Sequence, residues 1–329
     1  MYQLAEKKYW EGRTDYTDGA MGLRWHQILN QLDLTQSVHK SGAAKNVALL
    51  GFCSDEGVRR NKGRLGAQLG PDQLRKSMAS LPVHFDQEKL GLFDAGNIIC
   101  PNQQLERSQQ LLGQKVASLL SMGFLPVVMG GGHEVAYGHY LGLHQHLHHE
   151  QRSSLGILNI DAHFDLRTYE VETSSGTPFR QIADLRKHHS LPFHYLCMGI
   201  QHAGNTRALF DTAHRLNTKY VLAEDMRESQ WEDVRLRLRN WMHDKEAIYL
   251  TIDLDAIAAA HAPGVSAPTP FGLDPWVVRL ILQEVVQSGK LLSLDIAELS
   301  PALDQDGRTA KLAAQLVFAL LDNLNNQLV

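Results

Sequence analysis

Cysteine is scarce in this chain: Cys53, Cys100 and Cys197 are the three cysteines among 329 residues. They lie far apart in the sequence, so they form neither a disulfide framework nor a CxxC metal-binding motif. Such low use of cysteine is typical of proteins from a reducing compartment. We therefore expect a cytoplasmic protein.

Long apolar runs and a strong excess of charge are also missing. The first residues, "MYQLAEKKYW", lack the apolar core of a signal peptide, and no run approaches the roughly 18 residues that a membrane-spanning helix needs. The net charge is −4, which gives no basic surface for nucleic acid. The expected partner is a small-molecule substrate, with neither a nucleic acid nor a membrane.

Short apolar runs alternate with longer amphipathic stretches along the whole chain. The runs that predict buried strands are 46–52, 124–130, 155–161, 194–200, 247–253 and 291–297, and the stretches that predict helices include 70–81, 104–123, 231–243 and 274–289. This alternation is typical of an α/β protein whose central parallel sheet is covered by helices on both faces. Because no repeat, linker or hinge interrupts it, we expect a single domain over residues 1–329.

Polar clusters follow four of the predicted strands, in "VVMGGGHE", "LNIDAHFD", "LTIDLDA" and "SLDIAE". In open parallel sheets, ligands bind at the carboxyl ends of the strands. If the extended conformation continues beyond residue 160, Asp161, His163 and Asp165 share one face, since alternate side chains of a strand do. Glycines 130–132 would let the backbone turn tightly and approach the site before His133.

The strand ends together supply four carboxylates and two imidazoles as candidate metal ligands: His133, Asp161, His163, Asp165, Asp253 and Asp255. This set contains no thiolate and is rich in oxygen, which favours Mn²⁺ over Zn²⁺. Six side chains exceed the needs of one ion, whereas two ions about 3.5–4 Å apart, bridged by carboxylates, would use them all. Six unrelated surface residues would not share a position at strand ends.

The segments "GGGHE", "NIDAHFDLR", "LTIDLDA" and "SLDIAELSP" resemble the metal and active-site blocks of the ureohydrolase (arginase/agmatinase) family, and "GRLGAQLGPDQLR" and "DAGN" resemble its amino-terminal blocks. The resemblance implies a three-layer α/β/α fold, a homo-oligomer (trimer or hexamer) and a pair of manganese ions. It assigns His133 and Asp165 to one ion, His163 and Asp255 to the other, and Asp161 and Asp253 as bridges.

Three further segments, "YWEGRTDYTDGAMGLRWHQ", "GGGHEVAYGHY" and "GIQHAGNT", are most similar to the formimidoylglutamase branch of that family. This branch implies hydrolysis of N-formimidoyl-L-glutamate to L-glutamate and formamide in histidine degradation, through attack of a metal-bridging hydroxide on the formimidoyl carbon. Asp165 would pass a proton to the leaving nitrogen. Glu298 would pair with the cationic group of the substrate; the alternative is a helix-capping or surface glutamate.

The chain departs from arginases at two positions near these motifs. Arg167 stands where arginases carry asparagine, and a guanidinium can grip a substrate carboxylate with two hydrogen bonds; the alternative is an ion pair with a structural acid. Ser175 stands in place of the proton-shuttling histidine, which argues against arginase activity. Arg180 is a second candidate for binding a carboxylate. Asn205 is a candidate pocket residue, although a role in loop structure explains it equally well.

Other functions remain open at this point. An agmatinase or a guanidino-acid hydrolase would use the same metals; Arg167 argues against agmatinase, whose substrate has a cationic tail, but it suits a guanidino-acid. A non-catalytic metal-binding protein of the same fold is a further alternative. A deacetylase with a single zinc ion fits poorly with the two additional aspartates.

Overall fold

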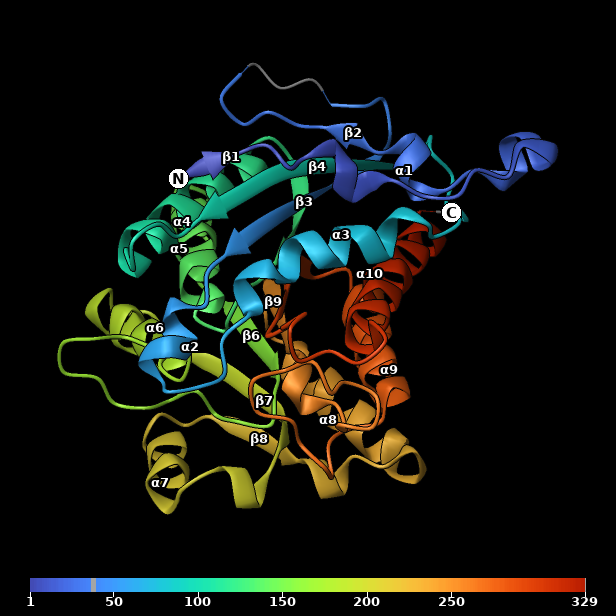
Figure 1. Ribbon diagram of the computed structural model, residues 1–329. Helices are drawn as coiled ribbons and strands as arrows, with labels where there is room; N and C mark the ends of the chain where they lie inside the picture. The colour runs from blue at the N-terminus through green and yellow to red at the C-terminus, as the bar shows by residue number, and fades with distance from the viewer. Residues whose placement is uncertain (37–39, 329) are drawn as a thin grey trace.

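The computed structural model describes residues 1–36 and 40–328, and therefore the expected domain except residues 37–39 and 329. Within these residues, ten strands form one sheet in the order β1-β4-β3-β5-β10-β9-β6-β7-β8, with β2 paired to β4 (Figure 1). The strands are β1 (Tyr2–Gln3), β2 (Asn30–Gln31), β3 (Lys45–Cys53), β4 (Leu90–Ile99), β5 (Phe124–Met129), β6 (Leu155–Ile160), β7 (His194–Ile200), β8 (Lys219–Leu222), β9 (Ala247–Asp253) and β10 (Leu291–Ala297).

The six strands predicted from apolar runs are all present, and β7, β9 and β10 have the predicted bounds. The sequence analysis missed β4, because the buried polar residues Asp94 and Asn97 interrupt its apolar run. It also missed β8, a strand of four residues at the edge of the sheet. The sheet is parallel except at β1, which pairs with β4 in the antiparallel sense.

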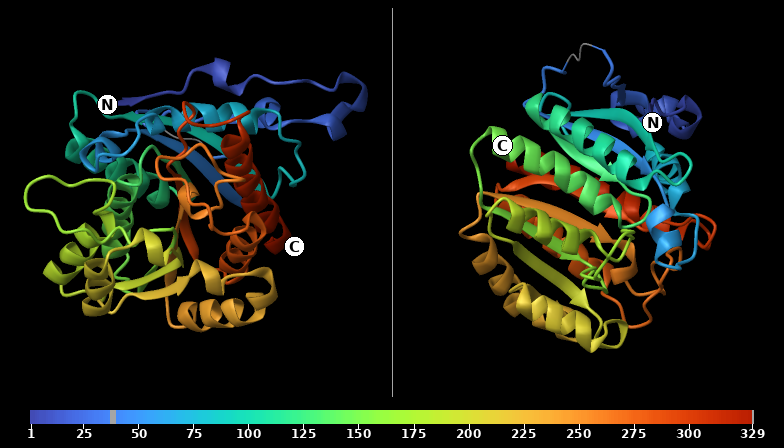
Figure 2. Two further views of the ribbon diagram at one scale, coloured as in Figure 1. Left: turned by 60° about the horizontal axis from the view of Figure 1, so that its bottom comes forward. Right: turned by 90° about the vertical axis from the view of Figure 1, so that its left-hand side faces the viewer.

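Helices cover both faces of this sheet (Figure 2). The helices are α1 (Trp25–Ile28), α2 (Glu56–Arg60), α3 (Gly70–Ala79), α4 (Leu105–Ser121), α5 (Val135–His149), α6 (Pro178–His188), α7 (Arg207–Arg215), α8 (Trp231–Met242), α9 (Pro275–Gln287) and α10 (Arg308–Gln327). One face packs against α3, α8, α9 and α10, and the other packs against α4 to α7. Alternate strand residues enter the two cores: Val127 joins the first and Val128 the second. The expected three-layer α/β/α architecture is confirmed.

In the described part of the chain, no helix combines the length and the apolarity that crossing a membrane requires.

Four neighbouring parallel strands, β5, β10, β9 and β6, end at the same edge of the sheet. Their register pairs Ile296 with Met129, Ala297 with Asp253, and Ile252 with Ile160. Residues that follow these pairs therefore leave the sheet side by side. This arrangement brings together the four polar clusters that lie far apart in the sequence.

Candidate metal centre

Turns, and not extended chain, shape the acidic segments after β6 and β9. Asp161 accepts a hydrogen bond on Oδ1 from the N–H of His163 at 2.7 Å, and Asp253 accepts one on Oδ1 from the N–H of Asp255 at 2.8 Å. An aspartate that bonds the backbone two residues ahead folds the chain into a tight turn. Asp165 itself lies in the left-handed region, with φ of 47°. The condition of an extended chain past β6 is therefore not met, although Asp161, His163 and Asp165 still lie together in the ligand groups.

The glycine segment after β5 lies in close contact with the loop after β3. A Cβ atom on Gly131 would lie 1.7 Å from the carbonyl oxygen of Ser54, so only glycine fits there. The N–H of Gly132 donates to the same carbonyl oxygen at 2.9 Å, and the N–H of Glu298 donates to the carbonyl oxygen of Gly131 at 2.8 Å. These contacts fix the backbone that presents His133 to the site.

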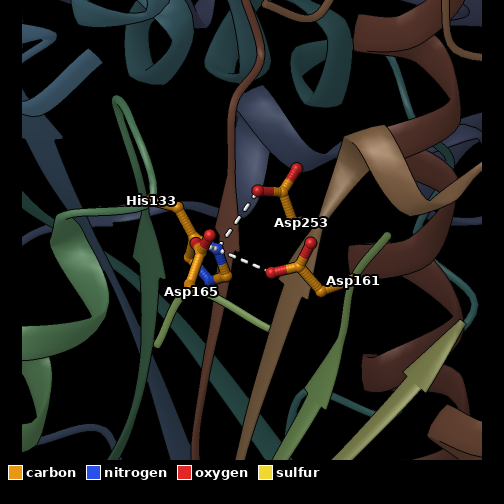
Figure 3. A group of neighbouring side chains, drawn as sticks. All are labelled: His133, Asp161, Asp165 and Asp253. Atoms are coloured by element: carbon orange, nitrogen blue, oxygen red, sulfur yellow. Dashed lines mark ion pairs between the residues drawn. The ribbon is translucent and has the colours of Figure 1, made fainter. Parts of the chain in front are cut away.

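The six candidate ligands form two overlapping groups that could each hold a metal ion. One group is His133, Asp161, Asp165 and Asp253, the other is Asp161, His163 and Asp255, and the ligand atoms of each group lie within 4.8 Å of one another. Around His133 Nδ1, three carboxylate oxygens converge at 3.0–3.1 Å, from Asp161, Asp165 and Asp253 (Figure 3). Asp161 joins the two groups, whereas Asp253 belongs to the first.

Burial and crowding shift the pKa values of these groups. Burial raises the pKa of Asp253 well above its ordinary value, and the charges of Asp255 and Asp161 add to the effect. Burial and the charge of Asp161 raise the pKa of Asp165 to about 6. Burial lowers the pKa of His133, but the three carboxylates around its Nδ1 outweigh this effect and the net shift is strongly upward. Such crowding of buried negative charge favours a bound cation.

Two buried atoms point to the same conclusion. Among the described residues, His133 Nδ1 and Asp255 Oδ1 have no hydrogen-bond partner. Buried polar atoms of this kind are rarely left without one. Because imidazole nitrogen and carboxylate oxygen are ligands that suit a divalent cation such as Mn²⁺, the cluster fits a metal ion.

A cavity of about 380 Å³ opens onto this cluster. Its buried side includes His133, Asp253 and Asp255, together with Glu298. Its more exposed side is basic and polar, and is lined by Asn61, Lys62, Arg64, Arg167 and Ser266, while Ser175 is a buried part of the lining. Acidic groups thus line the buried side, and cationic groups line the solvent side.

Glu298 lies inside this cavity with 5% of its surface exposed. Its backbone has a φ of 70°, a left-handed conformation that is uncommon for residues other than glycine. Oε1 accepts a hydrogen bond from the N–H of His133 at 2.8 Å, whereas Oε2 is buried without a partner in the described part of the chain. The alternative of a surface or helix-capping glutamate does not fit this position.

The three other predicted substrate-binding residues differ in position. Arg167 lines the cavity, and its guanidinium makes no ion pair within residues 1–36 and 40–328, so the alternative of a structural acid is not seen. Arg180 lies outside the cavity lining and pairs with Asp184 at 3.0 Å.

Asn205 is also absent from the cavity lining. Its Nδ2 donates to the carbonyl oxygens of Ala162 and Gln201, both at 2.9 Å, and its Oδ1 accepts from the N–H of Phe164 at 3.1 Å. Because all three bonds are to backbone atoms, Asn205 holds the loop that carries His163. This is the structural alternative that the sequence left open.

Two kinds of residue escaped the sequence analysis. Lys62 and Arg64 line the cavity, and the signal for them was the basic stretch "RRNKGR" before a glycine-rich segment. The hydroxyl of Thr251 forms a hydrogen bond with His133 Nε2 and another with Asp295 Oδ1, and all three residues are buried. Their signal was a polar residue in the middle of a buried strand.

The comparisons with known proteins agree with this geometry. The family model described as Arginase family matches residues 45–322. A formimidoylglutamase of Clostridium tetani is 43% identical over 98% of this chain and 96% of its own length, and one of Chromobacterium violaceum is 44% identical over 98% and 99%.

Solved structures show the same fold. The structure of formimidoylglutamase from Bacillus subtilis has a TM-score of 0.81 at 21% identity and covers 96% of this chain and 95% of its own. Trypanosoma cruzi formiminoglutamase, solved with Mn²⁺, has a TM-score of 0.75 at 23% identity and covers 85% and 94%. The family match and the full-length relatives lead to one conclusion: the chain belongs to the arginase family.

Proposed function

We propose that this protein hydrolyses N-formimidoyl-L-glutamate to L-glutamate and formamide, with the help of two Mn²⁺ ions. The observation that carries the proposal is the polarity of the cavity. A buried carboxylate, Glu298, lines the cavity beside the candidate metal ligands, and the guanidinium of Arg167, an exposed residue without an ion pair among the described residues, lines it as well. The substrate has the same polarity, because its formimidoyl group is a planar cation and its other end carries carboxylates. The relatives that match nearly the whole chain are named formimidoylglutamases.

The two groups of ligands would each hold one ion. His133 and Asp165 belong to one group, His163 and Asp255 to the other, and Asp161 to both. When bound, such cations would supply Lewis acidity, which lowers the pKa of a coordinated water molecule towards neutral pH. The enzyme from Trypanosoma cruzi is a precedent for manganese in this fold.

Glu298 would orient the reacting group. Its Oε1 is held by the N–H of His133, and its Oε2 has no hydrogen-bond partner in the described residues, although Glu298 lines the cavity. There it can accept a hydrogen bond from an N–H of the formimidoyl cation. A hydrogen bond between charged partners is about twice as strong as a neutral one.

Arg167 and Lys62 would hold the carboxylates at the other end of the substrate. Of the three cations at the cavity, Arg64 donates to the carbonyl oxygens of Ser266 and Val265, both at 2.8 Å, and so shapes the cavity wall. Arg167 and Lys62 make no such bonds in the described residues. A guanidino-acid, with one carboxylate, would use one of these two cations.

Asp165 would supply the proton that the reaction needs. The water oxygen forms a bond to the formimidoyl carbon, and the bond from this carbon to the glutamate nitrogen breaks. The leaving nitrogen must gain a proton, because an amide anion is a poor leaving group. Asp165 lines the cavity beside His133, with 13% of its side chain exposed, and can transfer a proton released by the attacking water.

An assay with added manganese tests the proposal against its competitors. The purified chain should release glutamate and formamide from N-formimidoyl-L-glutamate, and no urea from arginine, agmatine or guanidinobutyrate. Urea from guanidinobutyrate would assign the chain to the guanidino-acid hydrolases. Two bound ions without turnover of any of the four compounds would identify it as a metal-binding protein without this activity.

A further inference from the structure

A buried chain of hydrogen bonds connects His133, one of the candidate metal ligands, to Asp295 on β10. His133 Nε2 lies 3.0 Å from Thr251 Oγ1, and Thr251 Oγ1 lies 2.5 Å from Asp295 Oδ1. His133 is 1% exposed, and Thr251 and Asp295 are fully buried. The chain therefore runs through the core, where water does not compete for these bonds.

The chemistry of the groups fixes the direction of these bonds. A carboxylate only accepts hydrogen bonds, so the hydroxyl proton of Thr251 points to Asp295. The hydroxyl oxygen then offers a lone pair to His133 Nε2, which must carry a proton to make the bond. In the neutral imidazole, Nδ1 is consequently left with its lone pair. That atom faces the carboxylates of Asp161 and Asp253 at 3.1 Å.

Two further contacts hold Asp295 in place, and one of them comes from a donor. His139 Nδ1, from α5, lies 2.6 Å from Asp295 Oδ2, and the hydroxyl of Tyr249, from β9, donates to the same oxygen. His139 is itself fixed by a contact of 2.7 Å between Nε2 and the Ser293 hydroxyl. Asp295 therefore cannot turn away from Thr251 without losing both contacts to Oδ2.

We propose that Thr251 and Asp295 are positioning residues that keep the proton of His133 on Nε2 and so prepare Nδ1 to bind one of the two metal ions. The inference rests on the metal site of the proposed function. A hydrogen bond to the second nitrogen of a metal-binding histidine sets its tautomer and its orientation, and loss of such a partner typically costs 10–100-fold in metal affinity. Here a threonine stands between the histidine and the carboxylate.

A matched pair of variants at one position tests the inference. Thr251→Val keeps the shape of the side chain but removes the hydroxyl, whereas Thr251→Ser keeps the hydroxyl and removes a methyl group. The measurement is the manganese content of each protein after dialysis against graded free Mn²⁺, together with the melting temperature of the metal-free protein. We expect Thr251→Val to lower the affinity of the protein for one of the two Mn²⁺ ions about 10–100-fold and to leave its affinity for the other unchanged. Thr251→Ser should bind both ions as the wild type does.

Asp295→Asn tests the direction of the hydrogen bonds. Because the Tyr249 hydroxyl donates to Asp295 Oδ2, the amide oxygen of the variant should occupy that place. Its NH₂ group then faces Thr251 and reverses the chain, so the Thr251 hydroxyl donates to His133 Nε2 and the imidazole proton moves to Nδ1. This variant should lose affinity for the same ion as Thr251→Val.

The outcomes separate the inference from the proposed function. Wild-type affinity in Thr251→Val, or in Asp295→Asn, would overturn the inference while leaving two metal ions in place. An equal loss in Thr251→Ser and Thr251→Val would also overturn it, because the effect would then come from packing. A wild-type chain that holds no manganese would contradict the proposed function itself.

Discussion

Glu298 and His133 are joined by a hydrogen bond in which the backbone N–H of His133 donates to Glu298 Oε1 at 2.8 Å. They are 165 positions apart in the sequence, at the ends of adjacent strands β5 and β10. Through this bond, the backbone of a candidate metal ligand also orients the carboxylate that would face the substrate. In the proposed function, binding of the substrate cation and binding of the metal would therefore be coupled.

Replacement of Glu298 by glutamine tests the role of its charge. The amide oxygen of Glu298→Gln can still accept the N–H of His133, so the backbone should keep its place, but the attraction to a formimidoyl cation is lost. A hydrogen bond to a charged group contributes about 1.5–3 kcal/mol, so kcat/KM should fall about 10–100-fold. Steady-state kinetics and metal analysis check this, and manganese content should not change. Glu232→Gln, an exposed position on α8, serves as the control. Wild-type kinetics in Glu298→Gln would remove Glu298 from the reaction.

Arg167 and Arg180 form a matched pair for testing carboxylate binding. Arg167→Ala should raise KM for N-formimidoyl-L-glutamate about 10–100-fold and leave manganese content unchanged, because a charged hydrogen bond at the far end of the substrate is lost. Arg180→Ala should leave KM near its wild-type value, since Arg180 is paired with Asp184 outside the cavity. Arg167→Lys should be intermediate, because an ammonium cannot form the two parallel bonds of a guanidinium. If the two alanine variants had equal KM values, this role of Arg167 would be refuted.

Much of the fold could be predicted because buried parallel strands need apolar runs, and six such runs are uninterrupted in this sequence. The same logic failed for β4, where Arg75 neutralises Asp94 in the core. A charged residue in a strand normally indicates exposure. Here its partner is supplied by α3, nineteen positions earlier, which a search for local patterns does not detect.

The convergence of the six candidate ligands was predictable for a different reason, since parallel strands deliver their carboxyl ends to one edge of a sheet. The path of the chain beyond the strand was not predictable. Asp161 folds the chain by accepting the N–H of His163, a choice that depends on competition between local and extended hydrogen bonding. Asn205 presented the opposite difficulty: a polar residue near a site can bind either the substrate or the backbone, and here it binds the backbone.

The raised pKa of Asp165 should make the stability of the metal-free protein depend on pH. The pKa of this carboxyl is about 6 in the folded chain, through burial and the charge of Asp161, against about 3.9 when unfolded. Between these values the folded state binds the proton and the unfolded state does not, so the free energy of unfolding falls as pH rises from about 4 through 6. With EDTA present, Asp165→Asn should weaken this dependence and should melt above the wild type at pH 7.5.

At saturating manganese the order of the melting temperatures should reverse, so that Asp165→Asn melts below the wild type. The wild-type carboxylate then contributes to metal binding, and a bound ligand at 100 times its Kd stabilises a protein by about 2.7 kcal/mol. Melting temperatures in EDTA and in MnCl₂, at pH 5 and 7.5, give the comparison. If Asp165→Asn melted below the wild type both in EDTA and in MnCl₂, the prediction would be wrong. Burial of the Asp165 carboxyl beside Asp161 would then not destabilise the metal-free protein.

Arg75 and Asp94 form a buried ion pair whose role is stability and not catalysis. Arg75 is fully buried; its Nε and Nη2 each donate to the Asp94 carboxylate at 2.8 Å, and its Nη1 donates to Asn97 Oδ1 at 2.7 Å. Asp94→Ala removes the carboxylate that binds two nitrogens of the buried guanidinium and leaves Asp72 Oδ1, 3.3 Å from Nη1, as its charged partner. Removing one member of a buried ion pair typically costs about 3–5 kcal/mol.

Urea denaturation of the manganese-loaded Asp94→Ala protein should show a lower free energy of unfolding. The kcat of the enzyme that remains folded should equal the wild-type value, because neither Arg75 nor Asp94 lines the cavity. The double variant Arg75→Met/Asp94→Leu should recover much of the stability, since removing both charges avoids the desolvation cost. If Asp94→Ala lowered kcat without lowering the free energy of unfolding, the pair would have to act on the site, and its assignment to stability would be wrong.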